Sequence, residues 1–465
     1  MEQVRRTGGA TLHGGRLGEA RRALAPTTLV ERARSSPLAL GGVAFVGASV
    51  AVNLSNFAFH AALSRLLGPA GYGALGSLLN TLVVLSVPLG ALEAAVTRMV
   101  AARASIGSSA GCRRLSVQAV AVGALGSVVW AGLSPLVQGF LQLHSLWPVL
   151  LLGLSIVPMA VGAVWQGVLV GEQRFRTVAV AQVLGSGAAR LAMGVLLVSA
   201  GLGVSGAVLA TVTAGVVTLA VLLPSVRSRL TSADTGALTA GDAAWTIASL
   251  GGVATLTSLD TWLGRHFLSP LAAGYFTAAA TAGRIALFLP GTIILVFFPG
   301  LVKAAGRTAE AHTAIGRALI WVGACALVGV AVLVGASGLV VGVLFGAQFT
   351  PAVPVVRVLA AADGMAALIS TLVYFQLARR SRLAIAGWAG CVLMAGLAAL
   401  WHGSTQQLAW TMLAADAATL VTLGAASTLQ VRRDRRRLAA GPGPAAAGGR
   451  RAATFPALAR DRAVP

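Results

Sequence analysis

Two stretches of this chain carry the same pattern about 200 residues apart. The first reads LSRLLGPAGY at residues 63–72, and the second reads LGRHFLSPLAAGY at residues 263–275. Two further matches follow in the same order: Pro88-Leu-Gly90 is answered by Pro290-Gly291, and Val100-Ala-Ala-Arg103 by Lys303-Ala-Ala-Gly-Arg307. Matches that keep their order over such a distance indicate two similar halves.

The composition identifies the medium in which these halves fold. Of 465 residues, 57% are hydrophobic and 10% are charged, and the mean hydropathy is +0.83. A soluble domain carries about a quarter charged residues, so this chain has too little polar surface to face water. The long apolar runs show no period-two alternation, which favours helices over a barrel. We predict an all-α, polytopic membrane protein.

Twelve apolar runs reach the length of about 20 residues that a membrane helix needs. They lie at about 38–63, 74–96, 115–135, 148–170, 177–199, 204–226, 244–263, 274–300, 318–337, 353–377, 383–401 and 408–430. The stretch 338–352 either extends the ninth span or lies along the outer surface. Six spans separate the two copies, so the halves share one orientation and are related by an axis along the membrane normal. Such parallel repeats are a transporter architecture with the substrate path between the halves.

The predicted domain organisation follows from these spans. It is a basic disordered cytoplasmic tail (1–37), a six-helix bundle (38–230), a cytoplasmic linker (231–243), a second six-helix bundle (244–430) and a second basic disordered tail (431–465). The N-terminus does not read as a cleaved signal peptide, because its first apolar run starts too late and is too long.

Basic residues orient the spans. A cytoplasmic N-terminus assigns nearly all of them to cytoplasmic loops and the C-terminal tail: Arg98, Arg103, Arg113, Arg114, Arg174, Arg176, Arg227, Arg229, Lys303, Arg307, Arg317, Arg379, Arg380, Arg382, Arg432, Arg433, Arg435, Arg436 and Arg437. The outer loops then hold only Arg65 and Arg265. This distribution obeys the positive-inside rule with both termini cytoplasmic. Basic residues beside apolar spans also contact anionic membrane lipids.

Three arginines within predicted spans are candidates for substrate binding. Arg284, Arg190 and Arg357 would each be costly in lipid and therefore need a partner or a wet cavity. Guanidinium binds phosphate oxygens through paired, permanently charged donors. The alternative is that each arginine pairs with a nearby aspartate and locks the bundles together.

Three aspartates are candidates for coupling transport to a proton or sodium gradient. Asp363, Asp416 and Asp260 lie within spans, and a carboxylate in low dielectric binds a proton more tightly. Ion pairing with Arg357 or Arg190 is the alternative for Asp363 and Asp416. Asp363 and Arg357 differ by six positions, which places them on different helix faces. Asp260, near the outer end of its span, could instead reach head groups.

Two prolines are candidate hinges. Pro88 and Pro290 lie inside spans, where proline removes a backbone hydrogen bond and permits bending. The simpler reading is a static kink; the functional one is a hinge for alternating access.

Motifs for other function classes are missing from the sequence. The six histidines are scattered without HExxH, and neither a P-loop nor GxSxG occurs, so we expect no enzyme and no cofactor. The three cysteines are isolated, so we expect no metal site. The net charge of +22 lies in tails and loops without a recognition motif, so we expect no nucleic-acid binding. The short outer loops, nearly free of charge, argue against a glycosyltransferase or polymerase.

Four ordered stretches resemble a known family. LSRLLGPAGYGALGSLL (63–79), GVLVGEQRFRTVAVAQVL (167–184), SLDTWLGRHFLSPLAAGYFTAAATAGRIALFLPG (258–291) and LFGAQFTPAVPVVRVLA (344–360) are similar to polysaccharide-biosynthesis flippases of the multidrug/oligosaccharidyl-lipid/polysaccharide exporter superfamily. The resemblance covers most of residues 38–430.

The resemblance implies a V-shaped pair of six-helix bundles in the bacterial cytoplasmic membrane. Its implied activity is export of an undecaprenyl-pyrophosphate-type lipid-linked saccharide for surface polysaccharide, with polysaccharide polymerases or glycosyltransferases as further partners. Two alternatives stay open: a multidrug/cation antiporter of the same superfamily, and a non-transporting scaffold for envelope synthesis.

Overall fold

The computed structural model describes residues 37–104, 112–230, 240–287 and 308–439, and within these ranges it contains helices and no strand. The first half comprises α3 (Pro37–Ala104), α4 (Arg113–Phe140), α5 (Trp147–Leu154), α6 (Ile156–Gly171), α7 (Phe175–Gln182), η1 (Val183–Ala189), α8 (Arg190–Leu197), η2 (Val198–Leu202), α9 (Gly203–Val226) and η3 (Arg227–Arg229). The second half comprises α10 (Ala240–Phe267), α11 (Pro270–Gly283), α13 (Thr308–Leu344), η4 (Ala347–Ala352), α14 (Val353–Ala378), η5 (Arg382–Ile385), α15 (Ala386–Leu400) and α16 (Thr405–Ala439). We call them the N half and the C half.

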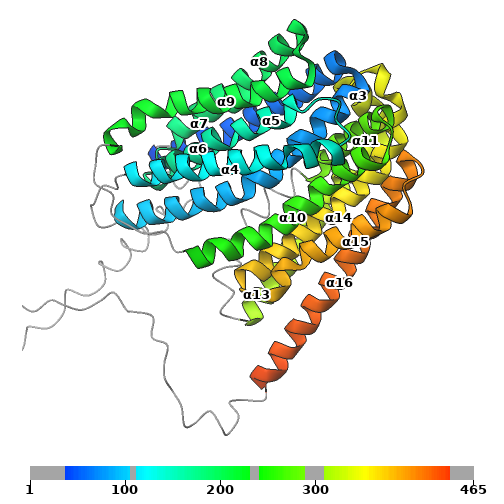
Figure 1. Cartoon of the computed structure of the whole chain (residues 1–465). Helices are drawn as coiled ribbons and strands as arrows, with labels where there is room; N and C mark the ends of the chain where they lie inside the picture. The colour runs from blue at the N-terminus through cyan, green and yellow to red at the C-terminus, as the bar shows by residue number, and fades with distance from the viewer. Residues whose placement is uncertain (1–36, 105–111, 231–239, 288–307, 440–465) are drawn as a thin grey trace, which may run out of the picture.

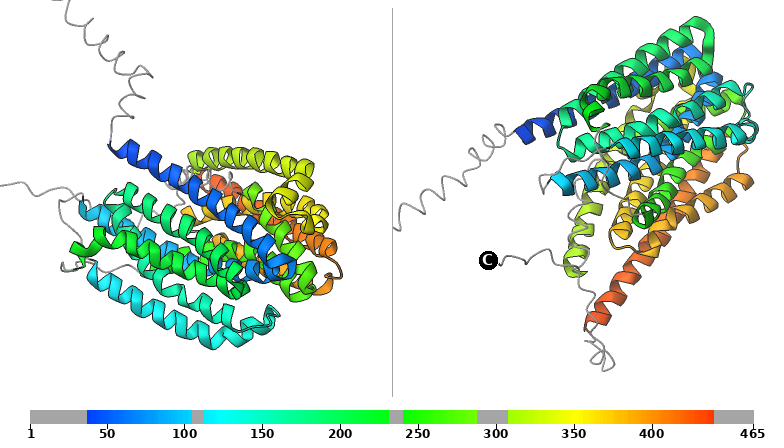
Figure 2. Two further views of the ribbon diagram at one scale, coloured as in Figure 1. Left: turned by 90° about the horizontal axis from the view of Figure 1, so that it is seen from above. Right: turned by 60° about the vertical axis from the view of Figure 1, so that its left-hand side comes forward.

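The two halves lie side by side, and α3 forms most of the boundary between them. Helices of the N half pack on one another, as do those of the C half, while α3 also packs on α10 and α11. Figures 1 and 2 show the halves meeting at one end and diverging toward the other. The structure thus confirms the all-α architecture of two helical bundles.

Each half has the same two ends. The described chain begins at Pro37 and finishes at Ala439 on one side, which we call the terminal end. Gly68, Phe140 and Phe267 lie at the opposite side, which we call the distal end. Because successive helices alternate direction, the arginine-rich stretches after α6, α9 and α14 all lie at the terminal end.

The first turn at the distal end needs only one residue. The predicted loop between the first two spans is wrong, because α3 continues on both sides of Gly68 (φ 65°, ψ 176°). Glycine adopts this positive φ without steric cost, and Pro69 starts the next helical segment, where its missing N–H is harmless. Gly68 is the only position in α3 with non-helical dihedrals, so the backbone at Pro88 is helical.

Other boundaries differ from the sequence-based expectation. α13 extends the ninth span to Leu344, and 347–352 then forms η4 at the distal end. The fifth span is wound as α7, π-helical η1 and α8. α10 begins inside the predicted linker, and α16 runs nine residues past 430, into the segment predicted to be disordered. Arginine is a good helix former, so a helix continues readily beyond the apolar run.

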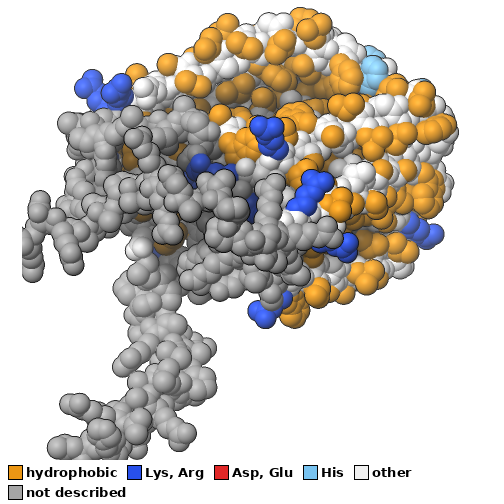
Figure 3. Space-filling view, turned by 90° about the horizontal axis from the view of Figure 1, so that it is seen from below, with side chains coloured by type: hydrophobic (Ala, Val, Ile, Leu, Met, Phe, Trp, Pro, Cys, Tyr) orange, Lys and Arg blue, Asp and Glu red, His pale blue; other side chains and the backbone are white. Residues whose placement is uncertain are grey.

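The surface agrees with a lipid environment. Among the described residues, eight helical stretches are long and apolar enough to cross a membrane. The stretch 175–229 contains two predicted spans, and 47–102 contains the second predicted span and most of the first. The face drawn in Figure 3 is mainly hydrophobic, with scattered basic side chains and no acidic side chain among the described atoms. An exposed apolar surface of this extent is unfavourable in water and favourable in a bilayer.

The two copies of the repeated sequence pack directly against each other. A Cβ on Gly274 would overlap the carbonyl of Pro69, and a Cβ on Gly73 would lie 2.9 Å from the backbone nitrogen of Gly274. Small residues allow helix backbones to approach this closely in membranes. The backbone contact at this point therefore depends on glycine.

Candidate functional site

Arg284 joins the two halves deep in the molecule. It follows the 14 residues of α11, which places it about 21 Å from the distal end at 1.5 Å per residue. Its Nη2 donates to the Thr257 carbonyl (2.8 Å), to Asp260 Oδ1 (3.2 Å) and to Thr261 Oγ1 (3.4 Å), and its Nη1 donates to Asn80 Oδ1. Asn80 belongs to α3 and the other partners to α10, so this guanidinium bridges the halves.

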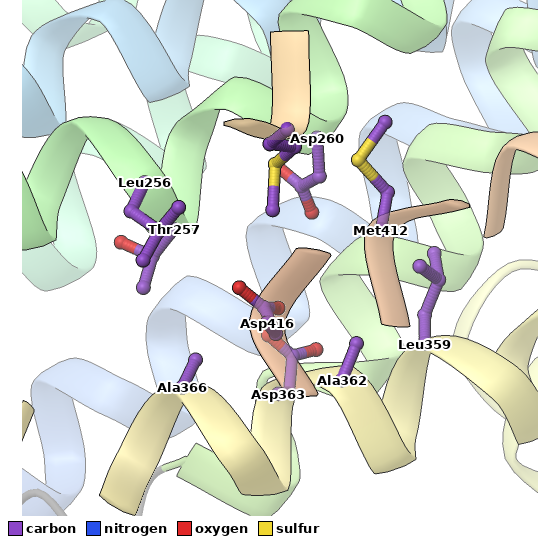
Figure 4. A pocket seen from close by; sticks show the side chains of 10 residues that line it. Leu256, Thr257, Asp260, Leu359, Ala362, Asp363, Ala366, Met412 and Asp416 are labelled. Atoms are coloured by element: carbon purple, nitrogen blue, oxygen red, sulfur yellow. The ribbon is translucent and has the colours of Figure 1, made fainter. Parts of the chain in front are cut away.

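Three aspartates surround a small cavity in the C half. Asp260 from α10, Asp363 from α14 and Asp416 from α16 line it together with Thr257 and apolar side chains (Figure 4). Figure 4 shows Asp363 and Asp416 next to each other, with Asp260 across the space. The cavity has a volume of about 10 Å³, which is close to the minimum for one water molecule.

The three carboxylates are not equally satisfied. Asp260 accepts hydrogen bonds from the backbone N–H (2.6 Å) and hydroxyl (3.0 Å) of Thr261 as well as from Arg284. Asp416 is 5% exposed, and its Oδ1 has no hydrogen-bond partner among the described residues. Asp363 is 7% exposed and lies against Gly283, where a Cβ would overlap its Oδ2. The cavity therefore holds at least one buried acceptor, Asp416 Oδ1, that lacks a donor among the described residues.

Arg190 occupies a second position, in the N half. It follows π-helical η1, and such windings are frequent at functional sites. Its Nη1 donates to Asn56 Oδ1 (3.0 Å), and its guanidinium lies 4.4 Å from the centre of the Phe59 ring. Its Nε is buried without a hydrogen-bond partner in the described part of the chain. One edge of this cation is therefore unsatisfied.

A short chain of hydrogen-bonded polar side chains crosses between the two halves near Arg284. His60 Nδ1 lies 2.8 Å from the Tyr72 hydroxyl, which donates to Thr281 Oγ1 at 3.3 Å, three residues before Arg284. His60 is within electrostatic range of both Arg190 and Arg284. The arginines thus flank a polar seam between the halves.

The structure brings some predicted residues together and separates others. Arg284 pairs with Asp260 within the C half, and Asp260 faces the interior instead of head groups. Arg357 lies apart: it is exposed near the distal end of α14, and its Nε donates to Ser337 Oγ (3.0 Å). Asp363 faces the cavity, so the two do not share a face, as their spacing predicted. Pro290 lies outside the described residues.

Sequence reasoning missed the neutral members of the site. Asn56 and His60 are four residues apart and so share a helix face, and Asn80 is the direct partner of Arg284. Amide and imidazole groups within apolar runs were the available signal, because they too need partners in lipid.

Among the residues that the structure describes, no group of three or more His, Cys, Asp or Glu side chains is placed to hold a metal ion. Cys112, Cys325 and Cys391 form no disulfide bond.

The fold has solved counterparts. A multidrug resistance MATE family transporter of the MOP superfamily matches in an inward-facing conformation with a TM-score of 0.68, 14% identity, and coverage of 83% of this chain and 96% of that chain. The outward-facing conformation of a multidrug resistance MATE family transporter of the MOP superfamily matches with a TM-score of 0.61 and 15% identity, and the match covers 87% of this chain and 98% of that chain. A MOP superfamily transporter from Pyrococcus furiosus matches with a TM-score of 0.57 and 15% identity, and the match covers 86% of this chain and 97% of that chain. No curated protein sequence matches the chain.

A family assignment comes from the sequence itself. The family described as polysaccharide biosynthesis protein (Polysacc_synt_3) matches residues 62–354, which is more than half of the chain and includes the distal turns of both halves. This match shows that the chain belongs to the polysaccharide biosynthesis protein family, and its fold is shared with solved MATE family transporters of the MOP superfamily.

Proposed function

We propose that this transporter moves an undecaprenyl-pyrophosphate-type lipid-linked saccharide across the bacterial cytoplasmic membrane by alternating access, for cell-surface polysaccharide synthesis. The observation that carries the proposal is the pair of arginines beside the seam between the halves. Arg190 comes from the N half and Arg284 from the C half, so an anionic group held by both would bind the two halves together.

The two arginines suit an anion better than a cation. A pyrophosphate presents several acceptor oxygens, and the unsatisfied Nε of Arg190 is a donor for one of them. Arg284 already neutralises Asp260, so this carboxylate is not free to attract a cationic drug. The Pyrococcus furiosus transporter is described as having a binding pocket of reverse polarity that suggests a different function. By analogy, pocket polarity in this chain is a guide to substrate charge.

We propose that the aspartate cavity couples transport to a proton or sodium gradient. Asp363 and Asp416 share the cavity with Asp260, the ion-pair partner of Arg284. A proton or cation on these carboxylates reduces the negative charge beside Asp260. With Asp363 and Asp416 neutralised, only Asp260 attracts Arg284 from this cavity. Whether Arg284 pairs with Asp260 or with the substrate then depends on the bound ion.

The remaining parts of the proposal concern orientation, hinges and partners. The positive-inside rule places the terminal end in the cytoplasm, where polysaccharide polymerases or glycosyltransferases and anionic lipids would meet the basic loops. Pro88 lies in α3, the helix that forms the boundary between halves, which is a suitable place for a hinge.

A second candidate function is export of cationic compounds. The observation that favours it is the poorly satisfied carboxylate pair, Asp363 and Asp416, in a fold shared with multidrug transporters. A scaffold without transport activity would need neither the buried carboxylates nor the mid-membrane arginines.

The deciding experiment analyses lipid-linked saccharides and surface polysaccharide in a strain that lacks the gene. We expect the lipid-linked intermediate to accumulate on the cytoplasmic side while surface polymer is lost, and the trapped sugar identifies the substrate. Wild type and Arg229→Ala should restore the polymer, because Arg229 pairs with Glu172 within the N half at the terminal end. Arg284→Ala and Arg190→Ala should insert normally and fail to restore it. Unchanged saccharides with increased drug sensitivity would instead support the cation exporter.

A further inference from the structure

Two arginines at the distal end play no part in the site described above. Arg65 and Arg265 occupy equivalent places in the repeated sequence, five residues beyond positions 60 and 260. They are also the two basic residues that the positive-inside argument assigned to outer loops. In the structure both belong to helices, near the distal end of α3's first segment and in the last turn of α10.

Arg265 of the C half binds the end of a helix in the N half. Its Nε donates to the Leu141 carbonyl and its Nη2 to the Gln142 carbonyl, both at 2.9 Å, directly after α4. Arg265 is only 2% exposed. The last carbonyls of a helix lack intrahelical partners and carry partial negative charge, so a guanidinium is a favourable cap.

Arg65 of the N half makes the reciprocal contact. Its Nη2 donates to the Val343 carbonyl at 2.6 Å, in the last turn of α13 in the C half. Next to it, Gln348 Nε2 of η4 donates to the Ser64 carbonyl at 3.3 Å. Gly346, which adopts φ 92°, lies beside the Arg65 side chain.

These contacts follow the internal repeat. Each arginine lies at the end of the first span of its own half, and each caps the end of the third span of the other half. α4 and α13 are those third spans, and both finish at the distal end. The arrangement is therefore reciprocal, as a two-fold relation between the halves requires.

The arginine contact on the α4 side is reinforced by neighbouring groups. Gln142 Nε2 donates to the His266 carbonyl (2.7 Å), and His266 Nδ1 lies 2.8 Å from the Phe140 carbonyl. The Phe140 and His266 rings stack with centres 4.6 Å apart. The halves thus exchange hydrogen bonds in both directions.

The position of these bonds tells which end they close. Among the described residues, every hydrogen bond between the halves lies between the distal end and the Asn80–Arg284 contact. Toward the terminal end, the halves diverge (Figure 1). The substrate path can exchange with the distal side only after the arginine contacts break.

We propose that Arg65 and Arg265 form a reciprocal latch that holds the distal end of the transporter closed. The latch rests on the proposed alternation of the two halves, but it requires no particular substrate. Both arginines bind backbone carbonyls, which have no ionisable proton. The latch therefore has a fixed strength, and release depends on what happens at the Arg284 and aspartate sites.

Distances between spin labels measure the latch directly. The background has Cys112, Cys325 and Cys391 replaced by serine. One label pair, Leu136→Cys with Leu400→Cys, reports the distal end, and both native side chains are 71% exposed. A second pair, Arg114→Cys with Arg382→Cys, reports the terminal end. Arg65→Ala and Arg265→Ala should each lengthen the distal distances and shorten the terminal ones, with a larger effect when combined.

The size of the effect follows from the bonds removed. Hydrogen bonds from a charged donor correspond to a shift of about tenfold to hundredfold in the ratio of distal-open to distal-closed protein. Arg229→Ala is the matched control, because it removes an arginine that binds Glu172 and the Ser225 carbonyl within one half. It should leave both distance distributions unchanged.

Two outcomes would overturn the latch. One is folded Arg65→Ala and Arg265→Ala protein, eluting as a single species, with the distal distances of the wild type. The other is an equal shift in the Arg229→Ala control. Where an alanine variant does not fold, Gln142→Ala is measured instead. It removes only the bond to the His266 carbonyl, so we expect a smaller shift in the same direction, and no shift would count against the proposal.

Discussion

The ion pair between Arg284 and Asp260 gives the most direct test of the site. The perturbation is a double-mutant cycle of Arg284→Gln, Asp260→Asn and the combined variant. In Arg284→Gln, Asp260 keeps its hydrogen bonds from Thr261 but loses its cation. In the combined variant, both members of the ion pair are neutral. We therefore expect the second substitution to recover part of the stability that the first removes.

The size of the coupling can be worked from the geometry. Unit charges 3.2 Å apart attract by about 5 kcal/mol at an effective dielectric constant of about 20. The arginine side chain is 27% exposed and the aspartate side chain 12%, so solvent screening and desolvation both reduce this value. Exposed pairs yield about 0–1 kcal/mol, and breaking a fully buried pair costs about 3–5. We expect an intermediate coupling of about 1–3 kcal/mol.

Chemical denaturation of the detergent-solubilised protein measures the four free energies of unfolding. The two substitutions should be non-additive by the expected coupling, with the combined variant more stable than the sum of the single losses predicts. Additivity within about 0.5 kcal/mol is typical of independent sites. Such additivity would refute the claim that Asp260 and Arg284 act as a pair.

Three further predictions follow from the same contacts. Gly274→Ala should lower the free energy of unfolding by about 1–3 kcal/mol, because its Cβ would overlap the Pro69 carbonyl; Gly338→Ala, which meets nothing within 4 Å, should be nearly neutral in the same denaturation assay. Asp416→Asn should fold normally and make the transport rate insensitive to imposed proton or sodium gradients; a rate that still follows the gradients would exclude this carboxylate from coupling. Gly283→Ala should displace Asp363 and weaken the same gradient dependence, whereas wild-type dependence would show that the cavity tolerates the displacement.

Much of the fold follows from requirements that act locally along the chain. A membrane helix needs an apolar run of about 20 residues. In the described part of the chain, the long stretches 47–102 and 175–229 each correspond to two successive spans that hydropathy predicted. The repeated motifs at 63–72 and 263–275 predicted two halves. The one-residue turn at Gly68 could not be predicted in the same way, because hydropathy gave only the interval 64–73 between the first two spans and not the dihedral angles within it.

The site depended on contacts between distant parts of the chain. The sequence predicted that Asp260 lies within a span. Its partner, Arg284, is determined by the packing of α11 beside α10. Asp363 and Asp416 come from different helices, and only the packing of α14 on α16 places them in one cavity. The neutral residues Asn80 and His60 carry no charge to mark them in a hydropathy profile, although they complete the network.

The repeat also explains how one frame supports both a symmetric latch and an asymmetric site. Arg65 and Arg265 are equivalent and make equivalent contacts across the halves. One and a half helical turns earlier, the equivalent positions are His60 and Asp260, and both side chains enter the polar seam. In the N half this position carries an imidazole near Arg190, and in the C half a carboxylate bound to Arg284. Closure of the distal end can therefore depend on the arginines that both halves have, while recognition of substrate charge depends on the position at which one half has His60 and the other Asp260. A His60→Asp substitution would make the two positions alike; we expect it to leave the distal label distances unchanged and to impair transport, because a second carboxylate would compete with an anionic substrate for Arg190.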